Sequence, residues 1–161
     1  MEKWFFEDMH FEQISKLVHI VSPSMEERNM ATYLRNEWLK NGADVMSDVM
    51  GNVYATINDS DSIHIGIVAH MDTAAIQITK ILSNGLLQFR NIGLHPHLLL
   101  GQNMKILSSK GIIQGVIGFD PTSQYGQPKG LIEDDLWLDI GASDYLEASS
   151  KVEIGDLAVL F

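Results

Sequence analysis

The sequence contains no cysteine. Disulfide bonds, thiolate nucleophiles and cysteine-ligated zinc sites are therefore excluded, and a bound metal would have to be held by His, Asp or Glu. No stretch approaches the roughly 20 consecutive apolar residues that a membrane-spanning helix needs, and the first residues mix acids with aromatics instead of placing a basic region before an apolar run. We expect a soluble, cytoplasmic protein.

Basic residues are scarce, because 11 Lys and Arg stand against 21 Asp and Glu and give a formal net charge of −10. Nucleic-acid-binding proteins usually carry a clustered basic face, so we expect neither nucleic acid nor a membrane as a partner. The 161 residues are 45% apolar and 20% charged, which is typical of globular proteins. This length suits one medium domain or two small ones.

Two helices are predicted near the start of the chain. Apolar residues recur at spacings of three and four over residues 11–21, which predicts an amphipathic helix that ends near Ser22-Pro23. A second helix follows, with Ser24 and Glu27 read as a capping box and Asn41-Gly42 as its stop signal. Glu26 and Glu27 could imitate a catalytic carboxylate pair, but the capping role is the interpretation we favour.

Beyond residue 42 the pattern becomes extended. Residues 45–57 predict a hairpin with its turn at Gly51-Asn52. The nearly continuous apolar run Ile63–Ala69 predicts a central strand covered on both faces, with His70-Met71-Asp72 at its carboxyl end. Ligands often bind beyond the carboxyl ends of strands in open α/β sheets, so this triplet is a candidate site.

From residue 76 onward short strands alternate with glycine-containing turns, which predicts a small barrel or sandwich. We place a domain boundary just after Asp72 and expect a long strand-free loop from Asp120 to Asp135. The predicted strands of this second domain are Ile76–Leu82, Leu86–Arg90, Met104–Leu107, Ile112–Gly118, Leu136–Ile140 and Leu157–Phe161.

The triplet His70-Met71-Asp72 is the sharpest chemical feature. Residues two apart in a strand point to the same side, so the Asp72 carboxylate can orient the His70 imidazole, as carboxylates do for metal-bound histidines. His-x-Asp is nevertheless a common pattern, and a histidine without a metal is the more frequent explanation of the triplet taken alone.

The order of several motifs resembles the tetrahedral and glutamyl aminopeptidase family of dinuclear zinc metallopeptidases. The resemblance covers nearly all of the chain, and its order and spacing are more specific than any single piece. The matching pieces are Pro23-Ser24 with Glu27, residues 48–53, residues 67–72, Asn84-Gly85, Ile92-Gly93, Gly111 with the strand 112–118, residues 138–142 and Gly155-Asp156.

The resemblance implies an α/β fold: the first part of a phosphorylase-like α/β aminopeptidase domain over residues 1–72, followed by a small β-rich, barrel-like dimerisation domain over residues 73–161. It implies a homo-oligomeric enzyme that uses zinc or cobalt, two ions per complete site, to remove N-terminal amino acids from peptides. His70 matches the first metal ligand and Asp72 the catalytic carboxylate that orients it.

The sequence departs from the family pattern beside the site, where Thr73-Ala74-Ala75 stands in place of an acidic residue and Ile-Gly. The family's bridging aspartate, glutamate base and other ligands follow the β-rich domain, so we expect an incomplete active site. Asp120 precedes residues 138–141 and cannot be that aspartate. Two alternatives remain open: a catalytically inactive assembly module, or a fragment whose strand Ile63–Ala69 needs partners to cover it.

Other candidates have simpler interpretations. His95-Pro96-His97 lacks a nearby carboxylate and is interpreted as structural or surface-exposed. His64 would lie about 20 Å from His70 along a strand, at roughly 3.3 Å per residue, and cannot share its metal. Histidines 10 and 19 belong to the predicted helical start. Glu133-Asp134-Asp135 is interpreted as a solvated acidic patch that could at most bind a cation weakly.

Overall fold

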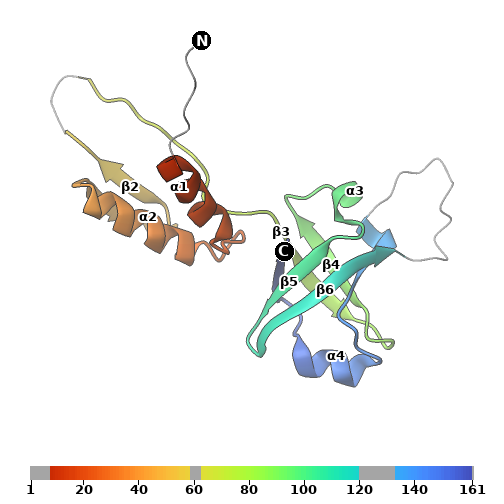
Figure 1. The fold of residues 1–161 in the computed structure, drawn as a ribbon. Helices are drawn as coiled ribbons and strands as arrows, with labels where there is room; N and C mark the ends of the chain where they lie inside the picture. The colour runs from red at the N-terminus through yellow and green to blue at the C-terminus, as the bar shows by residue number, and fades with distance from the viewer. Residues whose placement is uncertain (1–7, 59–62, 120–132, 161) are drawn as a thin grey trace, which may run out of the picture. The chain divides into compact units, whose positions relative to one another are not determined.

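The computed structural model describes residues 8–58, 63–119 and 133–160. They belong to two compact units, residues 1–73 and residues 74–161 (Figure 1). This division and the boundary expected after Asp72 lie one residue apart. Most of the loop predicted from Asp120 to Asp135 falls outside the described residues. In the described parts of the chain, no helix is long and apolar enough to cross a lipid bilayer.

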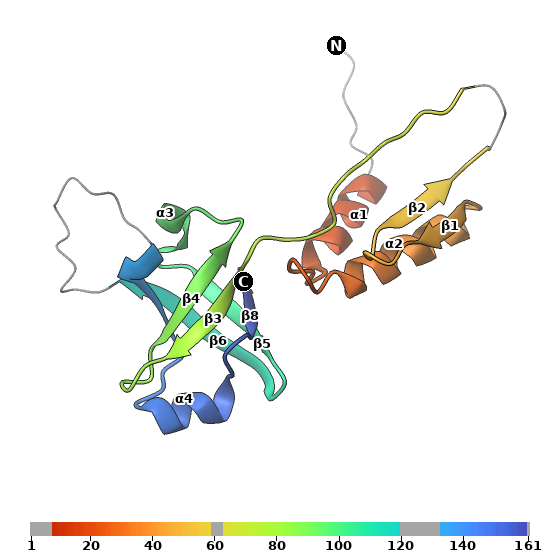
Figure 2. The same cartoon turned by 180° about the vertical axis from the view of Figure 1, so that it is seen from behind.

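The first unit contains two helices and a hairpin. These elements are α1 (Asp8–His19), α2 (Arg28–Lys40), β1 (Asp44–Ser47) and β2 (Val53–Thr56). The two strands pair antiparallel, and α2 packs against the hairpin, as Figure 2 shows from behind. Both predicted helices and the predicted hairpin are thus confirmed.

The predicted capping box of α2 is wrong. Helix α2 starts at Arg28, its N-cap residue is Glu27, and no side chain caps it. The Glu27 carboxylate instead accepts a hydrogen bond from the Met25 N–H, 2.8 Å away. The Ser24 hydroxyl donates to Asp72, 48 residues along the chain. A tertiary contact has therefore replaced the local bond that the spacing predicted.

The end of α2 and the hairpin turn follow local rules. Gly42, with φ of 79°, comes directly after the C-cap Asn41, as predicted. In the turn of the hairpin, Gly51 has φ of 90°. The Asp48 carboxylate accepts hydrogen bonds from Met50, Asn52 and the Tyr54 hydroxyl. The Asn52 side chain is the main cause that lowers the pKa of Asp48.

The predicted central strand Ile63–Ala69 is not a strand in the structure. Residues 63–70 are exposed and carry no regular secondary structure, and among the described residues no strand pairs with them. The side chains of Ile67 and Val68 are fully open to solvent, at 94% and 96% exposure. A strand forms only when neighbouring strands satisfy its backbone N–H and C=O groups, and an apolar run does not supply those neighbours.

Helix α1 also leaves its apolar face uncovered. Phe11, Ile14 and Val18 lie on the stripe that predicted the helix, and they are 72%, 52% and 69% exposed. Most helical stability in proteins comes from packing such a face against a core. The first unit therefore presents two apolar surfaces that nothing in the described residues covers.

The second unit is a closed antiparallel barrel with strand order β3-β4-β7-β6-β5-β8. All six predicted strands are confirmed, within one or two residues at their ends. Their bounds are β3 (Ala75–Ile81), β4 (Leu87–Ile92), β5 (Asn103–Ser108), β6 (Gly111–Phe119), β7 (Leu136–Asp139) and β8 (Leu157–Leu160).

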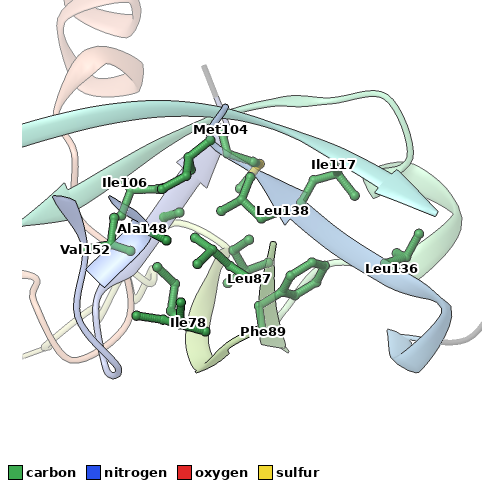
Figure 3. Packing of buried hydrophobic residues seen from close by; sticks show 14 of the residues in the cluster. Ile78, Leu87, Phe89, Met104, Ile106, Ile117, Leu136, Leu138, Ala148 and Val152 are labelled. Atoms are coloured by element: carbon green, nitrogen blue, oxygen red, sulfur yellow. The ribbon is translucent and has the colours of Figure 1, made fainter. Parts of the chain in front are cut away.

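The barrel encloses the hydrophobic core. Alternate residues of its strands point inward, and Met104 and Ile106 of β5, Leu87 of β4 and Leu138 of β7 are all 0% exposed. Figure 3 shows these side chains gathered together inside the barrel. Unlike the first unit, the second thus encloses a core of its own, although Ile112 and Val116 of β6 and Leu160 of β8 remain exposed on its outside.

Two short helices, α3 (Pro96–Leu99) and α4 (Tyr145–Lys151), were not predicted. In α4 the N-cap Asp144 accepts a hydrogen bond from the Glu147 N–H at 2.8 Å. The Glu147 carboxylate accepts bonds from both the N–H and the hydroxyl of Ser143, and it pairs with Lys151 at 2.8 Å. The spacing of Asp144 and Glu147 is the signal that would have predicted this helix.

Helix α4 should make the barrel sensitive to acid. The Lys151 ammonium, followed by the Ser143 N–H and hydroxyl, lowers the pKa of Glu147 from 4.5 to about 2. A carboxylate with a depressed folded-state pKa stabilises the protein above its unfolded pKa, and this contribution is lost between about pH 4.5 and pH 2. Between these pH values we expect the melting temperature of the wild type to fall more steeply than that of Glu147→Gln. If the two melting temperatures fall in parallel as the pH is lowered, Glu147 does not stabilise the barrel in this way.

Candidate active site

The segment that carries His70 and Asp72 is held by residues 22–24, within the first unit. The Thr73 N–H donates to the Ser22 carbonyl at 2.7 Å, and the Ser22 hydroxyl donates to the Met71 carbonyl at 3.1 Å. Pro23 and Thr73 form an isolated parallel bridge. Ser22 is fully buried, so these bonds fix the backbone on both sides of Asp72.

The structure brings His70 and Asp72 together, as the sequence predicted, although they lie in an irregular segment and not at the end of the strand that the prediction assumed. The His70 Nδ1 lies 3.0 Å from the Asp72 Oδ1 and 3.0 Å from the Asp72 carbonyl oxygen. A carbonyl oxygen and an ionised carboxylate can only accept hydrogen bonds, so Nδ1 carries the proton. When the imidazole is neutral, its lone pair is therefore on Nε2, which is the arrangement that a metal-binding histidine requires.

Asp72 has a second partner that the sequence analysis missed. The Ser24 hydroxyl donates to Oδ2 at 2.5 Å, and this bond is the largest cause that lowers the pKa of Asp72, ahead of the contribution of His70. Partial burial acts in the opposite direction. Asp72 is therefore held as a carboxylate, with each oxygen in a different hydrogen bond.

The described residues fit one metal ligand and its orienting carboxylate. The His70 side chain is 85% exposed, so Nε2 is accessible to an incoming ion. Protein zinc sites use three or four ligands, and no group of three or more His, Asp or Glu able to hold a metal occurs in the parts of the chain that the structure describes.

The other histidines lie outside this arrangement. His64 is exposed on the irregular segment before His70. The rings of His95 and His97 stack on each other with centroids 5.1 Å apart, in the second unit. His19 bonds through Nδ1 to the Ser15 carbonyl within α1, at 2.6 Å, and the side chain of His10 lies outside the described residues.

One residue of the predicted solvated acidic patch at residues 133–135, Glu133, has a structural role. Glu133 is half-buried at the start of a short 3₁₀ turn (Glu133–Asp135), and its carboxylate accepts a hydrogen bond from the Asn91 N–H at 2.8 Å. The carboxylate thus satisfies a backbone donor at the end of β4. The interpretation of Glu133 as merely solvated was wrong.

Comparison with known proteins identifies the class. Residues 51–161, more than half of the chain, match the model of the M42 glutamyl aminopeptidase family. The chain belongs to this family, as the motif order predicted.

Individual relatives support the assignment to this family. Over 116 residues the chain is 34% identical to the lysyl aminopeptidase of Pyrococcus furiosus, an alignment that covers 68% of this chain and 33% of that protein. Its structure is similar to a TET aminopeptidase of a marine-sediment Thaumarchaeota archaeon, with a TM-score of 0.82, 28% identity and coverage of 95% of this chain and 44% of that one.

A third relative is the TET1 peptidase of Pyrococcus horikoshii, described as assembling into a tetrahedron or a large octahedral shell. The match has a TM-score of 0.77 and 31% identity, and it covers 93% of this chain and 46% of that one. The chain thus spans less than half the length of each of these relatives.

Proposed function

We propose that this chain forms part of a metal-dependent aminopeptidase that removes N-terminal residues from peptides. The observation that carries the proposal is the hydrogen bond from His70 Nδ1 to Asp72, which leaves the Nε2 lone pair at an accessible position. Membership of an aminopeptidase family supports the reaction class. We also propose that the enzyme is cytoplasmic and acts as a homo-oligomer.

In this proposal His70 is a ligand of zinc or cobalt, and Asp72 is the carboxylate that fixes the tautomer of His70. When bound, such metals polarise the scissile carbonyl and lower the pKa of a water nucleophile. The other ligands and the general base would come from outside the described residues, because these contain no further ligand group.

We propose further that residues 1–72 are the first part of an α/β catalytic domain and residues 73–161 a β-rich dimerisation domain. The contrast between the units supports this division. The barrel is closed around its own core, whereas the first unit exposes the apolar side chains of Ile65, Ile67 and Val68. Such an exposed apolar run is what a sheet would leave when its neighbouring strands are missing.

The alternative is an assembly module without hydrolytic activity. The self-contained barrel favours it, together with the small number of ligands in the described residues. The self-assembly of the Pyrococcus horikoshii relative makes association between copies the property to measure. The two functions share one fold and differ in whether peptides are hydrolysed.

The purified chain should be assayed on a panel of aminoacyl-p-nitroanilides with added zinc or cobalt, while its mass in solution and its metal content are measured. Metal-dependent release of p-nitroaniline that a chelator abolishes supports the aminopeptidase. Self-association with neither tight metal binding nor turnover supports the assembly module and rejects hydrolysis by this chain.

A further inference from the structure

We propose that Ser24 is a positioning residue for His70: its hydroxyl holds the Asp72 carboxylate in the orientation that keeps the imidazole proton on Nδ1 and the lone pair on Nε2. The significance of this role for metal binding rests on the function proposed above. The hydrogen-bond chain itself does not, and it can be tested without a metal.

The first step is the contact between Ser24 and Asp72. The distance from Oγ to Oδ2 is 2.5 Å, at the short end of the range for a hydroxyl that donates to an ionised carboxylate. Ser24 is half-buried, so water competes less for this bond than it would at a fully exposed site. The hydroxyl is not engaged in capping α2, whose N-cap is Glu27.

The second step concerns how Asp72 is oriented. Its Oδ1 faces His70 and its Oδ2 faces Ser24. Two bonds on opposite oxygens resist rotation of the carboxylate about the Cβ–Cγ bond, which a single bond from a 85% exposed histidine would not do. The partner of one ring nitrogen decides which nitrogen carries the proton. The Asp72 carbonyl oxygen also lies 3.0 Å from Nδ1, so loss of the Ser24 bond should weaken the preference for the Nδ1–H tautomer without abolishing it.

The third step is the turn that presents Ser24. The Glu26 N–H donates to the Pro23 carbonyl at 2.9 Å, and Met25 has φ of 76°. Positive φ at the third residue is the signature of a type II turn, in which Ser24 occupies the second position. Residues other than glycine are strained in this region, so Met25 is held there at the expense of backbone strain.

Substitutions at Ser24 and Met25 can distinguish the effect of the hydroxyl from the effect of the turn. Ser24→Ala removes the hydroxyl and keeps the backbone. Ser24→Thr restores a hydroxyl, and Ser24→Cys supplies a thiol of similar size that donates weakly. Met25→Gly relieves the strained residue and leaves the hydroxyl in place, so it is the matched control for effects that act through the turn.

The test is the tautomer of His70, read from long-range ¹H–¹⁵N spectra of the metal-free chain under alkaline conditions. We expect the proton on Nδ1 in the wild type, in Ser24→Thr and in Met25→Gly, and a mixture with Nε2–H in Ser24→Ala. Ser24→Cys should lie between them. Zinc affinity, measured by competition with a chelating dye, should fall about tenfold in Ser24→Ala, the lower end for partners behind a ligand.

A purely structural Ser24 would lower the melting temperature on substitution and leave the tautomer unchanged, and that result overturns the proposal. If Ser24→Ala does not fold, an unchanged tautomer in Ser24→Cys overturns it equally. If the tautomer shifts as expected while the wild type neither binds zinc nor hydrolyses peptides, the positioning role stands and the proposed aminopeptidase function fails.

Discussion

Replacing His70 with alanine is expected to lower the affinity for zinc or cobalt by at least about 100-fold, and to remove metal-dependent peptide hydrolysis with it. Losing a residue behind a metal ligand typically costs 10–100-fold, so losing the ligand itself should cost at least the upper end of that range. The described residues contain no cluster of three or more potential ligands that could take over from the imidazole. Competition with a chelating dye measures the affinity, and p-nitroaniline release measures the activity.

The matched control is His64→Ala. His64 lies on the same irregular segment and is exposed like His70, whereas the hydrogen bond to the Asp72 carboxylate is made by His70. Its substitution should change neither the affinity nor the activity. An equal loss in both variants would show that the metal binds unspecifically to surface histidines, and an undiminished affinity in His70→Ala would remove His70 from the site.

The barrel was predictable because its signals are local. The alternation of apolar and polar residues, as around Met104 and Ile106 in β5, indicates a strand with one buried face. Gly85 and Gly111 mark the turns between neighbouring strands. Each signal spans a few residues, and the closed barrel lets every strand find a partner inside the same unit. Pattern and tertiary structure therefore agree.

The run Ile63–Ala69 shows where such reasoning ends. Its apolar pattern is as strong as that of any barrel strand, yet the structure leaves it irregular and exposed. A strand in the interior of a sheet needs hydrogen-bonded neighbours on both sides, and their presence cannot be deduced from the strand's own residues. The apolar pattern therefore indicates a strand only on the condition that neighbouring strands cover the segment.

The capping-box spacing misled the prediction for α2, and the same spacing was overlooked at α4. Ser24 and Glu27 fit the pattern, but the serine hydroxyl is bound to Asp72, which no local rule can anticipate. Asp144 and Glu147 fit it as well, and there the aspartate does cap the helix. At Ser24, the charge-assisted hydrogen bond to Asp72 forms in place of the capping bond that the local pattern predicts. The contact between His70 and Asp72 was predicted from the alternation of a strand, yet it forms in an irregular segment that Ser22 holds, and the role of Ser24 required the fold.

Replacing Gly85 with alanine is expected to destabilise the barrel by about 2–5 kcal/mol. Gly85 has φ of 84°, where an L-residue costs roughly 1–2 kcal/mol. A Cβ there would also lie 2.3 Å from the carbonyl oxygen and 2.8 Å from the carbonyl carbon of Ala142, so the backbone would have to move. Such overpacking typically costs a further 1–3 kcal/mol. Urea unfolding of the purified chain measures the sum.

The matched control is Gly101→Ala, because Gly101 has nearly the same φ, 77°, and a Cβ there would meet nothing within 4 Å. Both substitutions strain the backbone similarly and restrict the unfolded chain equally, so the difference between them isolates the contact with Ala142. We expect Gly101→Ala to cost only about 1–2 kcal/mol. Equal losses would mean that the close approach between the β3–β4 turn and the segment after β7 contributes nothing. A larger loss at Gly85 would mean that this contact requires glycine at that turn.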